Sequence, residues 1–207
     1  MVIQSNTLLI AGVDEAGRGP LAGPVVCAAV ILKKGQKLPG LNDSKKLSEK
    51  KREKLYELIT KNCISYGVGV LDNLYIDEHN IVKAVQKANE IAVDELLEKI
   101  EEKTGKKLKA ESLLVLIDGC DKQILKVPFK TIIKGDTFIR EIMAASIIAK
   151  VTRDRMMKKY DEMYPGYEFA RHKGYDTRLH RSLLNKLKPC EIHRMSYTPV
   201  YEAYNMR

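Results

Sequence analysis

The sequence predicts an α/β protein with a mixed sheet, for three reasons. Two apolar runs of strand length, Leu8–Val13 and Val25–Leu32, are joined by a connection rich in Gly and Pro, which favours paired strands. A later run, Leu113–Ile117, is short and uniformly apolar, as in a parallel strand covered on both faces. Long segments between and after these runs carry apolar residues at helical spacing.

The first half of the chain predicts an antiparallel meander. The segment Ile64–Leu71 alternates large apolar side chains with small or polar ones, which is typical of a half-buried strand. It follows a predicted helix that Ser48 caps and that runs to about Asn62. This strand would complete the meander that the two N-terminal runs begin.

The second half predicts helices separated by two further strands. Asp77 is a candidate cap for a long helix over 78–103, and Gly105 is its expected stop. Phe129–Ile133 follows a proline and is a candidate strand. The remaining predicted segments are a helix over Thr137–Met163, a basic and aromatic loop over 164–176, a helix over Thr177–Leu187, and a tail over 188–207 with little regular pattern.

Composition argues against membrane and disulfide-stabilised classes. The chain has 207 residues, of which 44% are hydrophobic and 30% are charged, as expected of a soluble protein with a sizeable core. No apolar stretch approaches the roughly 20 residues of a membrane helix, and the N-terminus shows no signal peptide. Four scattered cysteines without a CxxC pair suit reduced thiols. We therefore expect a cytoplasmic protein without a membrane partner.

The charge balance points to a polyanionic partner. The formal net charge is +9, and such an excess favours nucleic acid as a ligand. The excess is concentrated, because residues 150–194 hold 12 Lys and Arg but only 6 Asp and Glu. A solvated basic surface is the plainer alternative.

Acidic residues stand at the ends of several predicted elements. Asp14 and Glu15 follow the first strand, Asp118 follows the run at 113–117, and Asp136 precedes the next long helix. If the first and fourth strands lie side by side, Asp14 and Asp118 converge, and Asp136 approaches from the helix start. Such oxygen ligands suit hard divalent ions such as Mg²⁺ or Mn²⁺. Each acid also has an ordinary alternative, as a solvated pair, an Asp-Gly turn or a helix N-cap.

Ordered blocks of the sequence resemble a known enzyme family. DEAGRGPLAGPV at 14–25 closely resembles the signature of type 2 ribonucleases H, the family of the bacterial HII enzymes. The resemblance spans nearly the whole chain in order. Its further blocks are DSKKL at 43–47, IDEHNI at 76–81, DG at 118–119, KGD at 134–136, AASIIAKVTRD at 144–154, HKGY at 172–175 and HRMSY at 193–197.

The resemblance implies a ribonuclease H-like fold, a five-stranded mixed sheet flanked by helices with a C-terminal helical region. It implies one domain over 1–207, with a catalytic core to about residue 165 and a substrate-binding region from about 166. The implied activity is metal-dependent endonucleolytic hydrolysis of the RNA strand of RNA–DNA hybrids, and incision 5′ of single ribonucleotides in duplex DNA. The implied products carry 3′-hydroxyl and 5′-phosphate ends, as ribonucleotide and primer removal require.

The resemblance also assigns residues. Asp14, Glu15, Asp118 and Asp136 match the catalytic acids that bind Mg²⁺ or Mn²⁺, with two ions expected. Gly17, Arg18 and Gly19 match the motif that senses the ribonucleotide 2′-hydroxyl, the group that distinguishes RNA from DNA. Tyr175 matches a tyrosine that stacks on the deoxyribose after an RNA–DNA junction. Further expected substrate contacts are Ser44, Lys45, Lys46, Ser146, Lys150, Arg153, His193 and Arg194.

The departures from the family pattern are small. Thr137 stands where serine is usual, and Met195 and Tyr197 replace the commoner Arg and Phe. The related type 3 enzymes usually lack the GRG turn and carry an N-terminal substrate-binding domain, whereas this chain begins almost at its first predicted strand. We expect a monomer, and the sequence identifies no protein partner.

Three alternatives stay open on the sequence alone. The basic surplus suits a nucleic-acid binding module without catalysis as well as it suits an enzyme. A zinc site could use His172, His180, Cys190 and His193, although the set lacks a paired-cysteine half. Ser44 or Ser146 as a nucleophile is disfavoured because no histidine base stands in the local pattern.

Overall fold

A five-stranded mixed sheet forms the centre of the computed structural model, which describes residues 8–206. The strand order is β3-β2-β1-β4-β5; β1, β2 and β3 pair antiparallel, whereas β4 pairs parallel with both β1 and β5. The predicted mixed sheet is confirmed, and the first and fourth strands are neighbours, which is the condition under which Asp14 and Asp118 converge. The strands are β1 (Leu9–Ala16), β2 (Val25–Ile31), β3 (Ser65–Leu71), β4 (Leu113–Asp118) and β5 (Phe129–Ile132).

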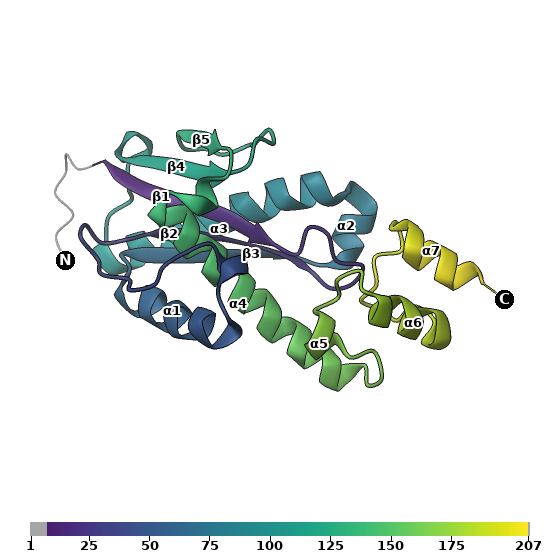
Figure 1. Ribbon diagram of the computed structural model, residues 1–207. Coiled ribbons are helices and arrows are strands. Elements are labelled where there is room, and N and C mark those ends of the chain that lie inside the picture. Colours follow the sequence, from purple (N-terminus) through teal and green to yellow (C-terminus); the bar gives the residue numbers. More distant parts are fainter. Residues whose placement is uncertain (1–7, 207) are drawn as a thin grey trace.

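Helices cover both faces of this sheet (Figure 1). Helix α3 packs on β2 and β3 from one side, and α4 packs on β1 and β2 from the other, with α1 beside it. Three short helices, α5 to α7, gather at the end of the molecule that carries the C-terminus. The helices are α1 (Glu49–Asn62), α2 (Asn73–His79), α3 (Ile81–Thr104), α4 (Arg140–Met163), α5 (Phe169–His172), α6 (Arg178–Leu187) and α7 (Thr198–Asn205).

Two apolar cores follow from the alternation of side chains along the strands. In β2, Cys27 and Ala29 face α3, whereas Val26 and Ala28 face α1 and α4. Every residue of β2 is buried, because helices cover this strand on both faces. This explains why its sequence is a continuous apolar run rather than an alternating one.

The start of α4 lies directly against the first strand. A Cβ atom added to Gly12 would stand 2.1 Å from the carbonyl carbon of Glu141, so only glycine allows this approach. The short 3-10 turn Gly135–Thr137 immediately precedes this helix. The close packing therefore brings Asp136 to the end of β1.

The predicted long helix over 78–103 is wrong in its N-terminal part. Asn80 has a φ of 71° and separates α2 from α3; its side chain caps α3 by accepting from the amides of Val82 and Lys83. Asp72, not Asp77, caps α2. The carboxylate of Asp77 instead accepts hydrogen bonds from the C-terminal segment, which it ties to α2.

Two further predictions need correction. Helix α4 begins at Arg140 rather than Thr137, and Asp136 caps no helix because it lies within the preceding 3-10 turn. The tail is not irregular, since it forms α7 with a proline in its first turn, a favoured helix-start residue. Residues 1–7, where the signal peptide was sought, and Arg207 of the tail lie outside the described residues.

The helices within residues 8–206 include none that could span a bilayer.

Candidate active site

Three aspartates from different parts of the chain meet at one edge of the sheet. Asp14 lies near the end of β1, Asp118 is the last residue of the parallel neighbour β4, and Asp136 lies in the turn before α4. One carboxylate oxygen from each lies within 4.8 Å of the others. The parallel pairing of β1 with β4 produces this convergence, as expected from the sequence.

Burial and mutual repulsion disfavour the ionised form of these carboxylates unless a positive charge lies nearby. Burial raises the pKa of Asp14 well above its usual value, and the charges of Glu15 and Asp118 raise it further. Burial and the charge of Asp136 raise the pKa of Asp118. A divalent cation among these oxygens would remove the repulsion, and hard oxygen donors are the ligands that Mg²⁺ and Mn²⁺ prefer. The donor set therefore fits such a cation.

Glu15 lies beside this triad rather than in it. Burial raises the pKa of its carboxyl, while the charge of Arg18 opposes that shift. Arg18 is 3.7 Å from Glu15 and 2.7 Å from Asp121, measured between guanidinium nitrogen and carboxylate oxygen. Sequence reasoning did not single out Asp121. It orients the arginine of the GRG motif at the rim of the acidic site.

Lysine and serine side chains of the segment 43–47 approach the site from another direction. The Lys45 ammonium is 3.4 Å from an Asp136 carboxylate oxygen, and the Lys45 side chain is largely exposed. Lys46 is exposed as well. Ser44 is buried, and its hydroxyl shares a 2.6 Å hydrogen bond with the hydroxyl of Ser146. Both lysines are exposed and can reach a phosphate, whereas the two serines hold the segment against α4.

The serine pair also bears on the nucleophile alternative. Each hydroxyl has the other as its partner, and within residues 8–206 neither forms a hydrogen bond with a histidine. Without a base beside them, these hydroxyls lack the activation that covalent catalysis needs.

The GRG loop is held from behind by buried Arg194, from the C-terminal segment. Its guanidinium donates to the carbonyls of Gly17, Arg18 and Gly23 at 2.5–3.0 Å. The hydroxyl of Tyr197 donates to the Arg18 carbonyl at 2.9 Å and accepts from Arg194 at 3.0 Å. The tyrosine that departs from the family pattern thus adds a hydrogen bond here. Gly17 has a φ of 98°, which favours glycine.

Arg153 supports the same loop from α4. It is fully buried, and it donates to the carbonyls of Ala22, Pro24 and Lys173 at 2.9–3.1 Å. His193 is also buried. Sequence reasoning expected Arg153, His193 and Arg194 to contact substrate, but their donors are used inside the protein. We therefore interpret these three residues as supports of the loops that face solvent.

Tyr175 is available at the surface beside these supports. Its side chain is 38% exposed, and the Lys150 ammonium and the Arg153 guanidinium lie over its ring at 5.4 Å and 5.6 Å from the centroid. A partly exposed aromatic ring with cations nearby suits a sugar–phosphate ligand.

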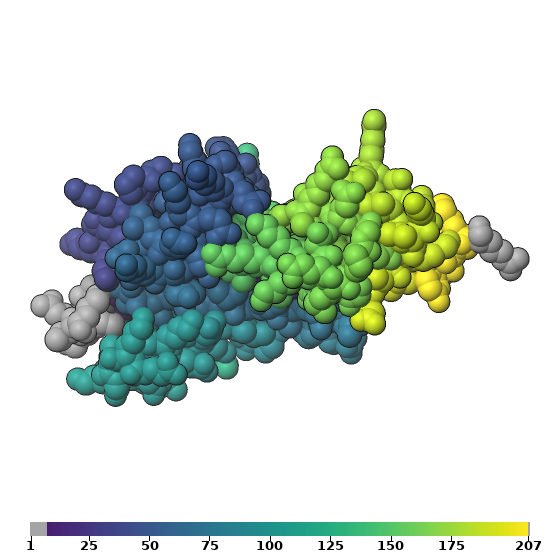
Figure 2. All heavy atoms as spheres, turned by 90° about the horizontal axis from the view of Figure 1, so that it is seen from below, coloured from purple at the N-terminus to yellow at the C-terminus, as the bar shows by residue number. Residues whose placement is uncertain are grey.

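The C-terminal third forms one end of the molecule (Figure 2), so the basic window at 150–194 is gathered there. This end adjoins the acidic site through the GRG loop, which contacts both. The arrangement places cationic surface next to candidate metal ligands, as a phosphodiester substrate requires.

The residues of the zinc alternative do lie together. Nε2 of His180 is 3.1 Å from Nε2 of His193, and the His172 and His180 rings stack at 4.1 Å. Nδ1 of His180 lies 3.0 Å from the Tyr175 carbonyl, and Nδ1 of His193 accepts from the Cys190 amide. His180 Nδ1 and His193 Nε2 therefore carry the protons. This chain of hydrogen bonds uses the ring nitrogens of both residues, and within residues 8–206 the aspartate triad is the only cluster with metal-site geometry.

The histidine pair predicts an acid-sensitive contribution to stability. Burial, followed by neighbouring histidine charge, lowers the pKa of His180 and of His193 to about 4. Between pH 6.5 and 4 the unfolded chain binds protons that the folded chain rejects, so this contribution falls as pH falls. At pH 5, each histidine should contribute about 2 kcal/mol less to the free energy of unfolding than it contributes at pH 7.5.

Urea unfolding at the two pH values tests this expectation. His193→Gln should be less stable than wild type at pH 7.5 but should lose less stability on going to pH 5. His79→Gln, a change in the exposed histidine of α2, is the control for the chemical change itself. If His193→Gln lost as much stability between pH 7.5 and pH 5 as the wild type does, the histidine pair would not reject protons.

The family model and the curated relatives agree on one family. The model of the family described as Ribonuclease HII matches residues 11–200. The chain is 50% identical over 202 residues to "Ribonuclease HII" of Geobacter metallireducens, covering 98% of this chain and 89% of that protein. Ribonuclease H2 from Pyrococcus horikoshii superposes with a TM-score of 0.76 at 25% identity, covering 95% and 97% of the two chains. Bst-RNase HIII in complex with Mn²⁺ gives 0.74 at 17% identity over 97% and 70%, which shows a shared fold.

Proposed function

The chain belongs to the ribonuclease HII family, and we propose which of its residues bind metal and which bind substrate. It is an endoribonuclease that hydrolyses the RNA strand of RNA–DNA hybrids. This excludes the alternative of a nucleic-acid binding module without catalysis. We further propose that it incises 5′ of single ribonucleotides in duplex DNA and leaves 3′-hydroxyl and 5′-phosphate ends, as ribonucleotide and primer removal require.

The observation that carries the assignment of the site is the convergence of three carboxylates within 4.8 Å. We propose that Asp14, Asp118 and Asp136, with Glu15 beside them, hold one or two divalent cations, Mg²⁺ or Mn²⁺. A bound cation would make a water nucleophilic at neutral pH and offset charge on the leaving oxygen.

Other residues of the chain bind and orient the substrate in this proposal. Lys45 and Lys46 bind phosphate oxygens of the substrate, while Arg18 contacts the sugar–phosphate backbone at the rim of the acidic site. The exposed turn at Gly19, together with Gly17, brings the main chain close to the ribose 2′-hydroxyl. Residues 1–165 would then act as a catalytic core and 166–207 as a substrate-binding region, in a monomeric cytoplasmic enzyme.

The deciding experiment compares two substrates. A DNA duplex with one embedded ribonucleotide and a continuous RNA–DNA hybrid are each incubated with the protein in Mg²⁺ or Mn²⁺, and product ends are mapped. We expect cleavage of both, with the embedded ribonucleotide left on the 5′ end of the downstream fragment. Cleavage of the hybrid alone would remove the proposed role at single ribonucleotides.

Tyr175→Ala should reduce cleavage at the RNA–DNA junction more than cleavage within a continuous hybrid. Loss of a stacking contact is worth about 1–3 kcal/mol, which corresponds to roughly tenfold or more in kcat/KM. Kinetics on both substrates measure the ratio, and Tyr204→Ala, a change in an exposed tyrosine of α7, serves as the control. Equal losses on both substrates would assign Tyr175 a structural role only.

A further inference from the structure

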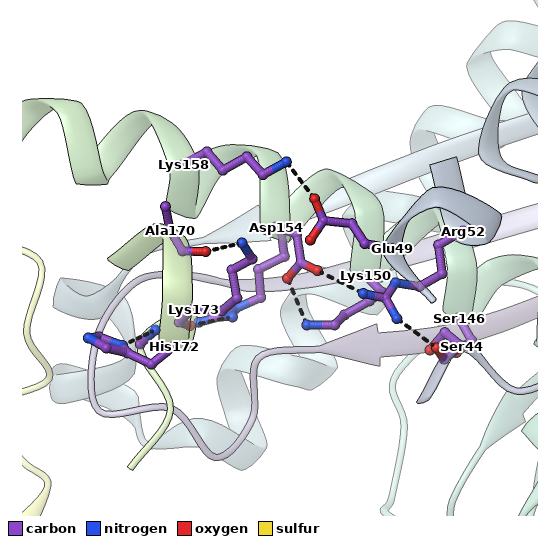
Figure 3. A network of polar contacts seen from close by, with 12 residues as sticks. Ser44, Glu49, Arg52, Ser146, Lys150, Asp154, Lys158, Ala170, His172 and Lys173 are labelled. Carbon is purple, nitrogen blue, oxygen red and sulfur yellow. Dashed lines mark hydrogen bonds and ion pairs between the residues drawn. The ribbon is translucent and has the colours of Figure 1, made fainter. Parts of the chain in front are cut away.

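A buried carboxylate that the proposed mechanism does not use lies on α4. Asp154 is 4% exposed. Its carboxylate accepts a 2.7 Å hydrogen bond from the ammonium of Lys150 and lies 3.6 Å from the guanidinium of Arg52 on α1 (Figure 3). One anion therefore holds two cations that come from different helices and point toward different parts of the surface.

The first of these cations supports the segment that carries Lys45. Arg52 donates to the carbonyl of Ser44 at 3.1 Å and to that of Leu47 at 2.6 Å. These two carbonyls bracket Lys45, whose ammonium reaches Asp136 in the acidic site. Figure 3 shows Arg52 between Asp154 and Ser44. Because the guanidinium serves both ends of this segment, its orientation fixes the position of Lys45.

The second cation lies beneath the exposed tyrosine. The Lys150 side chain is only 17% exposed, and its ammonium lies 5.4 Å from the centre of the Tyr175 ring. Without Asp154, this ammonium would be free to turn toward solvent. The carboxylate therefore keeps a cation against the face of the ring.

We propose that Asp154 is a positioning residue for substrate binding, which holds Lys45 through Arg52 and Tyr175 through Lys150. Its carboxylate contacts Lys150 and Arg52 rather than the candidate metal ligands. The inference rests on the proposed function of Lys45 and Tyr175 as substrate contacts. It predicts that loss of Asp154 weakens binding of every substrate that uses either contact, with little effect on the rate of chemistry once substrate is bound.

The sign of the effect separates positioning from plain electrostatics. Removing a carboxylate makes a basic protein more basic, which by itself strengthens binding to a polyanion. Positioning requires the opposite result. Asp154→Asn keeps the shape of the side chain and removes only its charge, so the two explanations predict changes of opposite direction for the same variant.

The experiment measures binding and kinetics on the full chain. Fluorescence anisotropy with a labelled RNA–DNA hybrid, without divalent metal, gives the dissociation constant, and steady-state cleavage in Mg²⁺ gives KM and kcat. We expect Asp154→Asn to raise both the dissociation constant and KM about tenfold and to leave kcat within about threefold. The matched control is Glu53→Gln, which removes the same charge from an exposed ion pair with Arg155 on the same helix pair; it should bind equally well or more tightly.

A second variant covers the case in which Asp154→Asn folds poorly. Arg52→Lys keeps the positive charge, but a compact ammonium lacks the extended planar fork with which the guanidinium reaches two carbonyls and a carboxylate in different directions. It should raise KM, and adding Lys45→Ala should then cost much less than it costs the wild type. Additive losses in this double-mutant cycle, or a dissociation constant for Asp154→Asn at or below the wild-type value, would overturn the proposal.

The wild-type arm keeps the two hypotheses apart. If wild-type protein cleaves both substrates but Lys45→Ala binds the hybrid normally and Tyr175→Ala binds a duplex with an RNA–DNA junction normally, the proposed substrate contacts are wrong. If those variants bind weakly while Asp154→Asn does not, the contacts stand and the positioning role of Asp154 is wrong.

Discussion

Asp14→Asn should abolish turnover on both RNA–DNA hybrids and ribonucleotide-containing duplexes, with a loss of at least about a thousandfold in kcat. Asp14 is a buried member of the carboxylate cluster and lies near the end of β1, beside the parallel neighbour β4. An amide oxygen keeps the shape of the side chain but supplies no negative charge to a divalent cation. The loss should therefore persist at saturating Mg²⁺, and wild-type-like rates there would refute the assigned site.

The same variant should not harm the fold. Burial and the neighbouring acids raise the pKa of Asp14 well above its usual value, so its ionised form costs free energy in the metal-free protein. Removing that charge should leave the metal-free melting temperature unchanged or raise it. Asp94→Asn, on the exposed side of α3, is the control for the chemical change itself. A large fall in the melting temperature of Asp14→Asn would make its inactivity uninformative.

Sequence patterns predicted the strands, whereas the acidic cluster followed only on the condition that the first and fourth strands lie side by side. Apolar runs of strand length predicted the strands, and the parallel character of β4 placed Asp118 beside Asp14, since both strands end at the same edge. Asp136 was harder because a helix-capping role was an equally good interpretation. Only the three-dimensional packing of α4 on Gly12 removes that alternative.

Local signals explain part of what the sequence analysis missed. Asn80 and the proline at the start of α7 are ordinary helix-start residues, and both were readable from the sequence. The break between α2 and α3 lies in the polar stretch 77–80, where no apolar residue shows whether the helical periodicity continues. Asp77 resembles a cap in sequence, but its partners are amides more than 100 residues away, which no local pattern reveals.

The function of individual basic residues could not be predicted from composition. Arg18, Arg153 and Arg194 are chemically identical, yet only Arg18 is exposed. The difference arises because the loop over 17–24 turns its carbonyls inward, and these acceptors need donors. Residue type therefore identified a basic region correctly, while the tertiary fold decides which of its cations remain for substrate.

Arg194→Met should be among the most destabilising single changes in this protein outside the apolar cores. The guanidinium serves three carbonyls in a site with no solvent access, and each buried acceptor left without a donor costs about 1–3 kcal/mol. Methionine fills the space and relieves the burial of a charge, which offsets part of that cost. We expect a net loss of about 3 kcal/mol in the free energy of unfolding, measured in urea.

Arg194→Met should also affect recognition of the substrate, because the GRG loop would lose the side chain that supports it. Arg194→Lys keeps the charge but cannot present a planar fork to several carbonyls, so its stability should fall between those of wild type and Arg194→Met. Arg181→Met, which removes an exposed arginine paired with Asp176 on the same helical region, should leave the free energy of unfolding nearly unchanged, because exposed ion pairs contribute little to stability. If Arg194→Met proved no more costly than Arg181→Met, the loop carbonyls would have another donor, and the C-terminal segment would not be what holds the GRG turn in place.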